Sequence, residues 1–343
     1  MSDHSARPHR GRLRAAWTLV LLTTLCAELT FTAVAVPVTW LLLPLLMVMY
    51  GAGVLVIREA AVRVDAKWPS LVLLGLAYQL AEDGLGLQAL TSPDMYGSAD
   101  WGWRALGVNW TYWESQIGVH VVFSVLIPIM LTGLLFPAQR GRPYLRTPGL
   151  VGVGVLAVLG VFGLRVVISA TEDPGYRTPW GWTVTFLLGI AALVFVALRV
   201  LPRRDLRGPA PAVSVPKPAV VGVAAGMSTF AFLILLLPPG LRPNSVFGDR
   251  VPLTMPLIVA AVLALAFAWT VLGWRAAQDW DNRHRVLLVG GILVGHTAFM
   301  MPASVTTALI GAATIALEVV ALVLLARRLE RRARDERSIL GEA

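Results

Sequence analysis

The chain has 343 residues, of which 57% are hydrophobic and only 14% are charged. A soluble domain carries about 25% charged residues, so a soluble fold could not cover this much apolar surface. The formal net charge of +9 does not indicate a nucleic-acid partner, because the basic residues form short clusters between long apolar segments, which is the orientation signal of membrane proteins. The one cysteine, Cys26, leaves no disulfide framework and no cysteine-based metal site.

Ten segments come close to the length of about 20 mainly apolar residues that a transmembrane helix needs. We therefore predict an all-α fold, a polytopic membrane bundle of about ten helices. In chain order the predicted spans are Ala15–Val36, Val38–Ile57, Pro69–Leu90, Gln116–Phe136, Pro148–Ala170, Trp180–Leu198, Ala219–Leu237, Val251–Leu272, Val286–Met301 and Thr306–Leu325.

The Lys and Arg residues gather at every second connection between these spans. If one mid-chain span were overlooked or wrongly assigned, every later basic cluster would fall on the opposite side of the membrane. The regular alternation therefore favours an even number of helices. We expect a multi-pass protein of the cell membrane with both termini in the cytoplasm. A cleaved signal peptide ending near Ala33-Val34-Ala35 is the alternative for the first span; Glu28 and the length of the apolar segment argue against it.

The predicted organisation has two membrane parts joined by a linker. A Pro- and Arg-rich stretch separates six helices from four, and an external loop, Thr91–Ser115, is rich in Trp, which is typical of an interfacial aromatic belt or of an amphipathic surface segment. The predicted parts are a basic N-terminus (1–14), a six-helix part (15–200), the linker (201–218), a four-helix part (219–325) and a basic tail (326–343).

Ionisable side chains inside the hydrocarbon are costly and mark function or structural ion pairs. Counting about 1.5 Å per residue from the start of each helix places most of them in the outer half of the membrane, whereas His296 falls near the middle and Glu318 in the inner half. We expect an acidic cavity that opens outward beneath the Trp-rich loop. The residues concerned are Glu28, Glu82, Asp83, His120 and Arg165.

Glu82 and Asp83 are adjacent, so on a regular helix their side chains diverge by about 100°. Both can face one point only if the helix is distorted, which the following Gly84 permits. Tyr78 and Gln79 share the face of Glu82 and are placed to hydrogen-bond to it. A structural ion pair of the acids with Arg165 and a catalytic role remain alternatives, as do packing and chemical roles for His120 and His296.

Several short motifs resemble an uncharacterised family of polytopic membrane proteins from high-GC Gram-positive bacteria, a resemblance that brings no function with it. A second similarity is to CPBP-type intramembrane proteases, related to the CAAX endopeptidases. It implies roles for Glu82, His120 and His296, with Asp83 and Leu87 departing from that motif. The motifs behind the first resemblance are Tyr50-Gly51-Ala52-Gly53, Ile57-Arg58-Glu59, Trp68-Pro69-Ser70, Ala81-Glu82-Asp83-Gly84-Leu85, and His120, Ser124 and Pro128.

Three hypotheses of function follow. The first is a membrane-embedded enzyme on an isoprenoid or other lipid-like substrate, in which Glu82 or Glu28 protonates the substrate in an acid-initiated terpenoid cyclisation, with Trp103, Trp110 and Trp113 stabilising the carbocation. The second is a peptidase that binds a divalent metal through His120 and His296; the other hypotheses need no cofactor. The third is a transporter or a noncatalytic envelope protein. The expected partners are membrane lipid and a hydrophobic small molecule, without nucleic acid; protein partners stay open.

Overall fold

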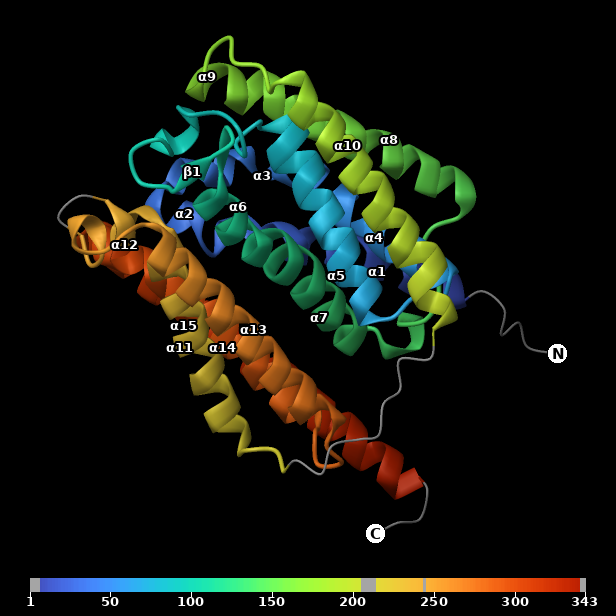
Figure 1. Ribbon diagram of the computed structural model, residues 1–343. Coiled ribbons are helices and arrows are strands. Elements are labelled where there is room, and N and C mark those ends of the chain that lie inside the picture. The colour runs from blue at the N-terminus through green and yellow to red at the C-terminus, as the bar shows by residue number, and fades with distance from the viewer. Residues whose placement is uncertain (1–6, 205–213, 243–244, 340–343) are drawn as a thin grey trace. The chain divides into compact units, whose positions relative to one another are not determined.

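The computed structural model describes residues 7–204, 214–242 and 245–339 (Figure 1). Almost all elements are helices, labelled α for α-helices and η for 3₁₀- and π-helices, and in the described residues the strands are a single antiparallel pair. The predicted all-α membrane bundle is confirmed. The predicted linker falls largely on 205–213, which lies outside the described residues, as do the ends 1–6 and 340–343 of the predicted terminal segments.

The chain divides into two compact units that are not contiguous in sequence. Unit 1 consists of Met1–Leu29, Val38–Leu206 and Leu236–Leu257. Its elements are α1 (Arg7–Thr24), η1 (Leu25–Leu29), η2 (Pro37–Leu42), α3 (Leu43–Leu46), η3 (Met47–Gly51), α4 (Ala52–Arg63), α5 (Trp68–Gln79), η4 (Leu80–Gly86), η5 (Met95–Gly97), β1 (Arg104–Ala105), β2 (Val108–Asn109), α6 (Trp110–Ile117), η6 (Gly118–Leu126), α7 (Ile127–Leu135), η7 (Pro137–Gln139), α8 (Thr147–Leu164), η8 (Arg165–Ser169), α9 (Ala170–Glu172), α10 (Trp180–Phe195), η9 (Val196–Val200), η10 (Leu201–Arg203), α12 (Pro238–Leu241) and η11 (Gly248–Arg250).

Unit 2 consists of Thr30–Pro37, Arg207–Leu235 and Ile258–Ala343. It takes a short piece of the N-terminal region together with most of the C-terminal helices. Its elements are α2 (Thr32–Ala35), α11 (Pro218–Leu236), α13 (Thr254–Ala276), α14 (Asn282–Met300), η12 (Met301–Ala303) and α15 (Val305–Ile339). The boundaries drawn from the sequence at 200 and 219 stay a prediction.

Eight helices of the described residues are long and apolar enough to cross a membrane. The first predicted span, Ala15–Val36, is not one unbroken helix, because η1 ends at Leu29 and α2 begins at Thr32. The third predicted span is helical through α5 and η4 but is not among the eight; it carries Gln79, Glu82 and Asp83, which lower its hydropathy. The eight are Pro37–Arg63, Trp110–Leu135, Thr147–Glu172, Trp180–Arg203, Pro218–Leu236, Thr254–Ala276, Asn282–Ala303 and Val305–Asp335.

A buried carboxylate at the end of α4 ties unit 1 together. Glu59 is fully buried and accepts hydrogen bonds from the backbone N–H groups of Tyr144 (2.7 Å) and Leu145 (3.1 Å). Its two oxygens also pair with Arg58 and Arg63, each at 2.6 Å. The Arg58 guanidinium lies 3.3 Å from the centroid of the Tyr144 ring. This charge is therefore surrounded by donors, which is the condition under which a buried ion pair is tolerated.

Glycines allow α11 and α14 of unit 2 to approach backbone to backbone. A Cβ atom added at Gly291 would lie 1.9 Å from the Gly222 carbonyl oxygen, and one at Gly295 would lie 2.4 Å from the Gly226 carbonyl oxygen. Gly222 and Gly226 face Gly291 and Gly295, so each helix presents two glycines four residues apart. This is the close-packing pattern of small residues in membrane helices.

Gly291→Ala is expected to destabilise the protein by about 1–3 kcal/mol, because the added methyl group meets rigid backbone and the two helices must separate. Gly273→Ala on α13 is the matched control, since nothing lies within 4 Å of its added Cβ. Thermal unfolding of the purified protein in detergent compares the two. Equal melting temperatures for both variants would contradict this packing.

Candidate functional site

The candidate acids of unit 1 and His120 lie on π-helical segments. Leu87 N–H donates to Glu82 O at 2.7 Å, an i→i+5 bond that widens the turn. π-Turns are rare in proteins overall, but those that occur are often found at functional sites. The extra residue in the turn also changes the direction in which the neighbouring side chains point. The helix is therefore distorted at Glu82 and Asp83, as it must be if both side chains are to face one point. The segments are η1 with Glu28, η3 with Tyr50, η4 with Glu82 and Asp83, and η6 with His120.

His120 lies between the two adjacent acids. Its Nδ1 is 3.4 Å from Glu82 Oε2, and its Nε2 is 3.1 Å from Asp83 Oδ2. All three side chains are 1% exposed. The two ring nitrogens of an imidazole are the atoms through which it gains and loses protons. The structure thus brings together three of the residues singled out from the sequence, in an arrangement suited to moving a proton.

Tyrosines surround this group. The Tyr112 hydroxyl donates to Asp83 Oδ1 at 3.3 Å, and the Tyr50 hydroxyl donates to Glu28 Oε1 at 2.6 Å. The ring of Tyr50 stacks on the His120 ring at 6.2 Å between centroids, and the Tyr78 ring meets it edge-on at 5.5 Å. Tyr50 and Tyr112 were not singled out from the sequence; Tyr50 opens the Tyr-Gly-Ala-Gly motif, which was the signal that could have found it.

The sequence predicts hydrogen bonds from Tyr78 and Gln79 to Glu82. Tyr78 lies within hydrogen-bonding reach of Glu82, and its hydroxyl donates to Met49 O at 3.1 Å. Gln79 Nε2 donates instead to Trp113 O at 2.7 Å. Both residues therefore connect the candidate site to neighbouring helices.

Several polar atoms of the site are buried without a hydrogen-bond partner among the described residues. Buried polar atoms are nearly always hydrogen-bonded, so a group of them in one place indicates a need for a polar ligand, water or a mobile proton. The atoms are both carboxyl oxygens of Glu82, Asp83 Oδ2, His120 Nδ1 and Gln79 Oε1. Of these, Glu82 Oε2, Asp83 Oδ2 and His120 Nδ1 face one another only through the ion-pair contacts given above.

The tryptophans proposed as cation-stabilising residues make other contacts. Trp110 and Trp113 stack on one another at 5.2 Å, and Trp113 meets Phe186 edge-on at 5.9 Å. The backbone N–H of Trp103 donates to Thr111 Oγ1 at 3.0 Å. In the part of the chain that the structure describes, the aromatic rings in contact with His120 are those of Tyr50 and Tyr78.

Two other predicted residues make contacts of their own. Arg165 Nη1 donates to Leu85 O at 3.4 Å, and no ion pair among the described side chains joins it to Glu82 or Asp83; the ionisable partner beside these acids is His120. His296 belongs to unit 2, where its ring stacks on Phe31 at 4.1 Å with an interplanar angle of 10°.

The Trp-rich loop positions Tyr112 over the site. Asn109 is fully buried; its side chain accepts the Tyr112 N–H at 2.8 Å, capping α6, and donates to Ser98 O at 3.0 Å. Arg104 donates to Thr91 O at 2.8 Å, and burial of its guanidinium lowers its pKa. Neither side chain is simply solvated, so the loop is a folded element that holds the Tyr112 hydroxyl against Asp83.

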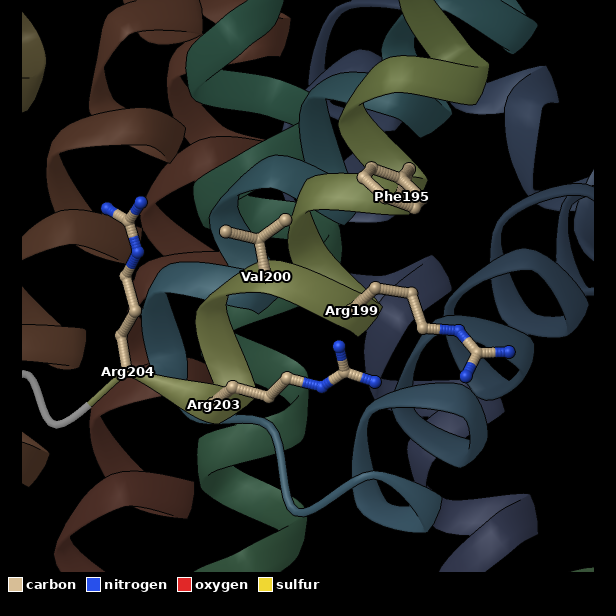
Figure 2. Close-up of a pocket in the computed structure, with 5 residues that line it drawn as sticks. All are labelled: Phe195, Arg199, Val200, Arg203 and Arg204. Atoms are coloured by element: carbon tan, nitrogen blue, oxygen red, sulfur yellow. The ribbon is translucent and has the colours of Figure 1, made fainter.

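A separate pocket of unit 1 is lined by basic side chains (Figure 2). It has a volume of about 740 Å³, and the figure shows Arg199 and Arg203 extending to one side of the helix and Arg204 to the other. None of the candidate residues lines it. The lining residues are Phe195, Arg199, Val200, Arg203 and Arg204.

Comparison with known proteins identifies the family. The model of an uncharacterized membrane protein family matches residues 18–332. The chain belongs to this family. The match covers both units, including every candidate residue, and it gives no support to the CPBP similarity or to a particular bacterial group. No curated protein and no solved structure matches this family member.

The residues of this family member do not fit the divalent metal that the peptidase hypothesis requires. Both ring nitrogens of His120 face carboxyl groups, and the ring of His296 stacks on Phe31. In the described residues, no three His, Cys, Asp or Glu side chains are grouped as metal ligands. The described residues thus supply no ready ligand set for the peptidase hypothesis.

Proposed function

We propose that this chain is a membrane-embedded enzyme that uses Glu82, His120 and Asp83 as a general acid–base group on a lipid-like substrate. The observation that carries the proposal is the position of buried His120, whose two ring nitrogens each face a carboxyl group. General acid–base catalysis needs side chains that exchange protons at positions fixed by the fold, and histidine and carboxylic acids are the usual ones.

Charge balance supports a proton donor in this group. Uncompensated charge inside a membrane protein is costly, so the cluster favours a net charge near zero. Each neutral state of two carboxyl groups and one imidazole keeps a proton on at least one carboxyl group. The site therefore holds a carboxylic acid that can donate a proton to a bound substrate.

The hydrogen bonds favour Glu82 as this acid. Tyr112 donates to Asp83 Oδ1, and a donated hydrogen bond stabilises the ionised form of a carboxyl group. Neither oxygen of Glu82 accepts a hydrogen bond of good geometry from the described residues, because the nearby Tyr78 hydroxyl donates to Met49 O. We propose that Asp83 and His120 form an ion pair and that Glu82 carries the mobile proton.

The surroundings favour a hydrophobic substrate, for which an isoprenoid is our proposal. Protonation of an alkene by Glu82 produces a carbocation, which the electron-rich faces of Tyr50 and Tyr78 can stabilise. Loss of a proton from the cyclised cation returns that proton to the cluster, so the cluster is regenerated. Terpenoid cyclisation satisfies these requirements without a cofactor.

Mass spectrometry of lipid extracts tests this proposal. Cells expressing the wild-type protein are expected to contain a product that is missing from cells expressing Glu82→Gln at the same membrane level, with the uncyclised substrate accumulating instead. Glu172→Gln is the matched control, because Glu172 is exposed; it should keep the product. Identical extracts from the wild type and Glu82→Gln would overturn the proposal.

Proton-coupled transport is the second candidate, favoured by a row of polar groups. Glu28 and Tyr50 are joined by a hydrogen bond, Tyr50 stacks on His120, and His120 contacts Glu82 and Asp83. Chains of acids and histidine serve as proton relays in membrane proteins. Proton flux into proteoliposomes, lost in Glu82→Gln and kept in Glu172→Gln, together with unchanged lipid extracts, would decide for transport.

The alternation of basic clusters supports a further proposal, that both termini face the cytoplasm. Protease digestion of sealed right-side-out vesicles tests it: a tag on either terminus should be protected.

A further inference from the structure

Unit 2 buries a carboxyl group of its own. Glu318 on α15 is 9% exposed, and Thr297 on α14 is fully buried beside it. The two helices pack along one another (Figure 1). Thr297 Oγ1 lies 2.9 Å from Glu318 Oε1 and 2.8 Å from the carbonyl oxygen of Thr30. Three oxygen atoms of different chemical kinds thus meet inside unit 2, at a place that the proposed acid–base chemistry does not use.

A break in the helix delivers the carbonyl oxygen. η1 ends at Leu29 and α2 begins at Thr32, so Thr30 lies between two helical segments. The backbone at Phe31 has φ −129° and ψ −80°, which is not helical. Unwound backbone within membrane helices is tolerated where it is buried in protein or serves a site, and its carbonyl groups commonly coordinate Na⁺ or protons.

The two short contacts of Thr297 cannot both be satisfied by its own hydroxyl group. A hydroxyl has one hydrogen, whereas Thr30 O and an ionised Glu318 are both acceptors. If the hydroxyl donates to one of them, two oxygen lone pairs face each other at the second contact. One additional positive charge removes this repulsion, either as a proton on Glu318 or as a metal cation among the oxygens.

Glu318 retains capacity for a further ligand. Its second oxygen, Oε2, is buried without a hydrogen-bond partner among the described residues, and an ionised carboxylate at this depth needs a cation to offset its burial. Carbonyl, hydroxyl and carboxylate oxygens are hard ligands that suit hard cations. A single negative charge is balanced by a monovalent cation.

We propose that Glu318, Thr297 and the Thr30 carbonyl group form a binding site for Na⁺, in which the ion takes the place of the proton on Glu318. The Glu318 and Thr297 side chains and the Thr30 carbonyl oxygen supply the ligands, and the ion neutralises the carboxylate. The site lies wholly within unit 2 and is independent of the acid–base group of unit 1.

The full-length protein, purified in detergent, provides the test. Its melting temperature is measured against increasing NaCl, with choline chloride keeping the ionic strength constant, and ²²Na⁺ binding is measured in parallel. A ligand that binds only the folded state raises the melting temperature as it saturates the site. The wild type should show a saturable rise and bind Na⁺; Glu318→Gln should lose at least tenfold in Na⁺ affinity.

Glu330→Gln is the matched control on the same helix, since Glu330 is 31% exposed and pairs with Arg283; its Na⁺ response should be unchanged. Thr297→Val, which removes only the hydroxyl ligand, should also weaken Na⁺ binding and serves if Glu318→Gln does not fold. A wild type that does not respond to Na⁺, or a response kept in both site variants, would overturn the site. Glu82→Gln should keep the Na⁺ response, so failure of the proposed enzyme would leave this test intact.

Discussion

Replacing Glu59 with alanine is expected to lower the free energy of unfolding by about 3–5 kcal/mol. Glu59 accepts two backbone N–H groups and pairs with two arginines. Its removal leaves the buried Arg58, 3% exposed, without its carboxylate, and two donors of the segment at Tyr144 without an acceptor. A buried charge that has lost its partner destabilises the folded state far more than the intact ion pair stabilises it. Thermal unfolding in detergent measures the loss.

Lys67→Ala is the matched control within unit 1. Lys67 pairs with Asp65 at 2.6 Å, but the two side chains are 65% and 89% exposed. An exposed ion pair contributes about 0–1 kcal/mol, so the melting temperature should hardly change. A Glu59→Ala variant as stable as Lys67→Ala would show that the Glu59 network does not hold unit 1 together.

The second large effect is expected on the proposed reaction. Glu82→Gln should slow product formation by about 10²–10⁴-fold, the usual contribution of a general acid, while Gln keeps the shape of the side chain. Asp83→Asn should also slow the reaction, because it removes the carboxylate that stabilises protonated His120. Initial rates of product formation in membranes from expressing cells measure both.

Tyr112→Phe separates the acid from its supporting hydrogen bond. The variant removes one hydrogen bond to Asp83, worth about 0.5–1.5 kcal/mol, and keeps the ring. We expect a loss of about tenfold or less. If Tyr112→Phe were as slow as Glu82→Gln, the hydroxyl would be the proton donor and the assignment of Glu82 would be wrong.

Much of the fold follows from the sequence, because membrane helices must satisfy their backbone hydrogen bonds internally and therefore appear as long apolar segments. Hydropathy alone describes two spans poorly: the first, which contains Thr30, and the third, which contains Glu82 and Asp83. Thr30 and Phe31 interrupt the first span without Gly or Pro to announce the break, and the polar residues of η4 lower the hydropathy of the third span.

The candidate site could be predicted as a set of residues but not as a geometry. Depth counting placed Glu82, Asp83 and His120 at a similar level, and the structure brings them together; their catalytic role stays a prediction. The contacts among Glu82, Asp83 and His120 depend on π-turns. The periodic pattern of hydrophobic residues in the sequence does not predict such turns. Tyr50 and His120 both lie on such turns, and the rings of Tyr50 and Tyr78 are the ones in contact with His120.

The state of Glu82 is the central claim, and infrared difference spectroscopy of the purified protein measures it most directly. Subtracting the spectrum of Glu82→Gln from that of the wild type at neutral pH should leave the C=O stretching band of a protonated carboxylic acid. A difference spectrum that contains only carboxylate bands would mean that Glu82 is ionised, and the proposed proton donor would not exist.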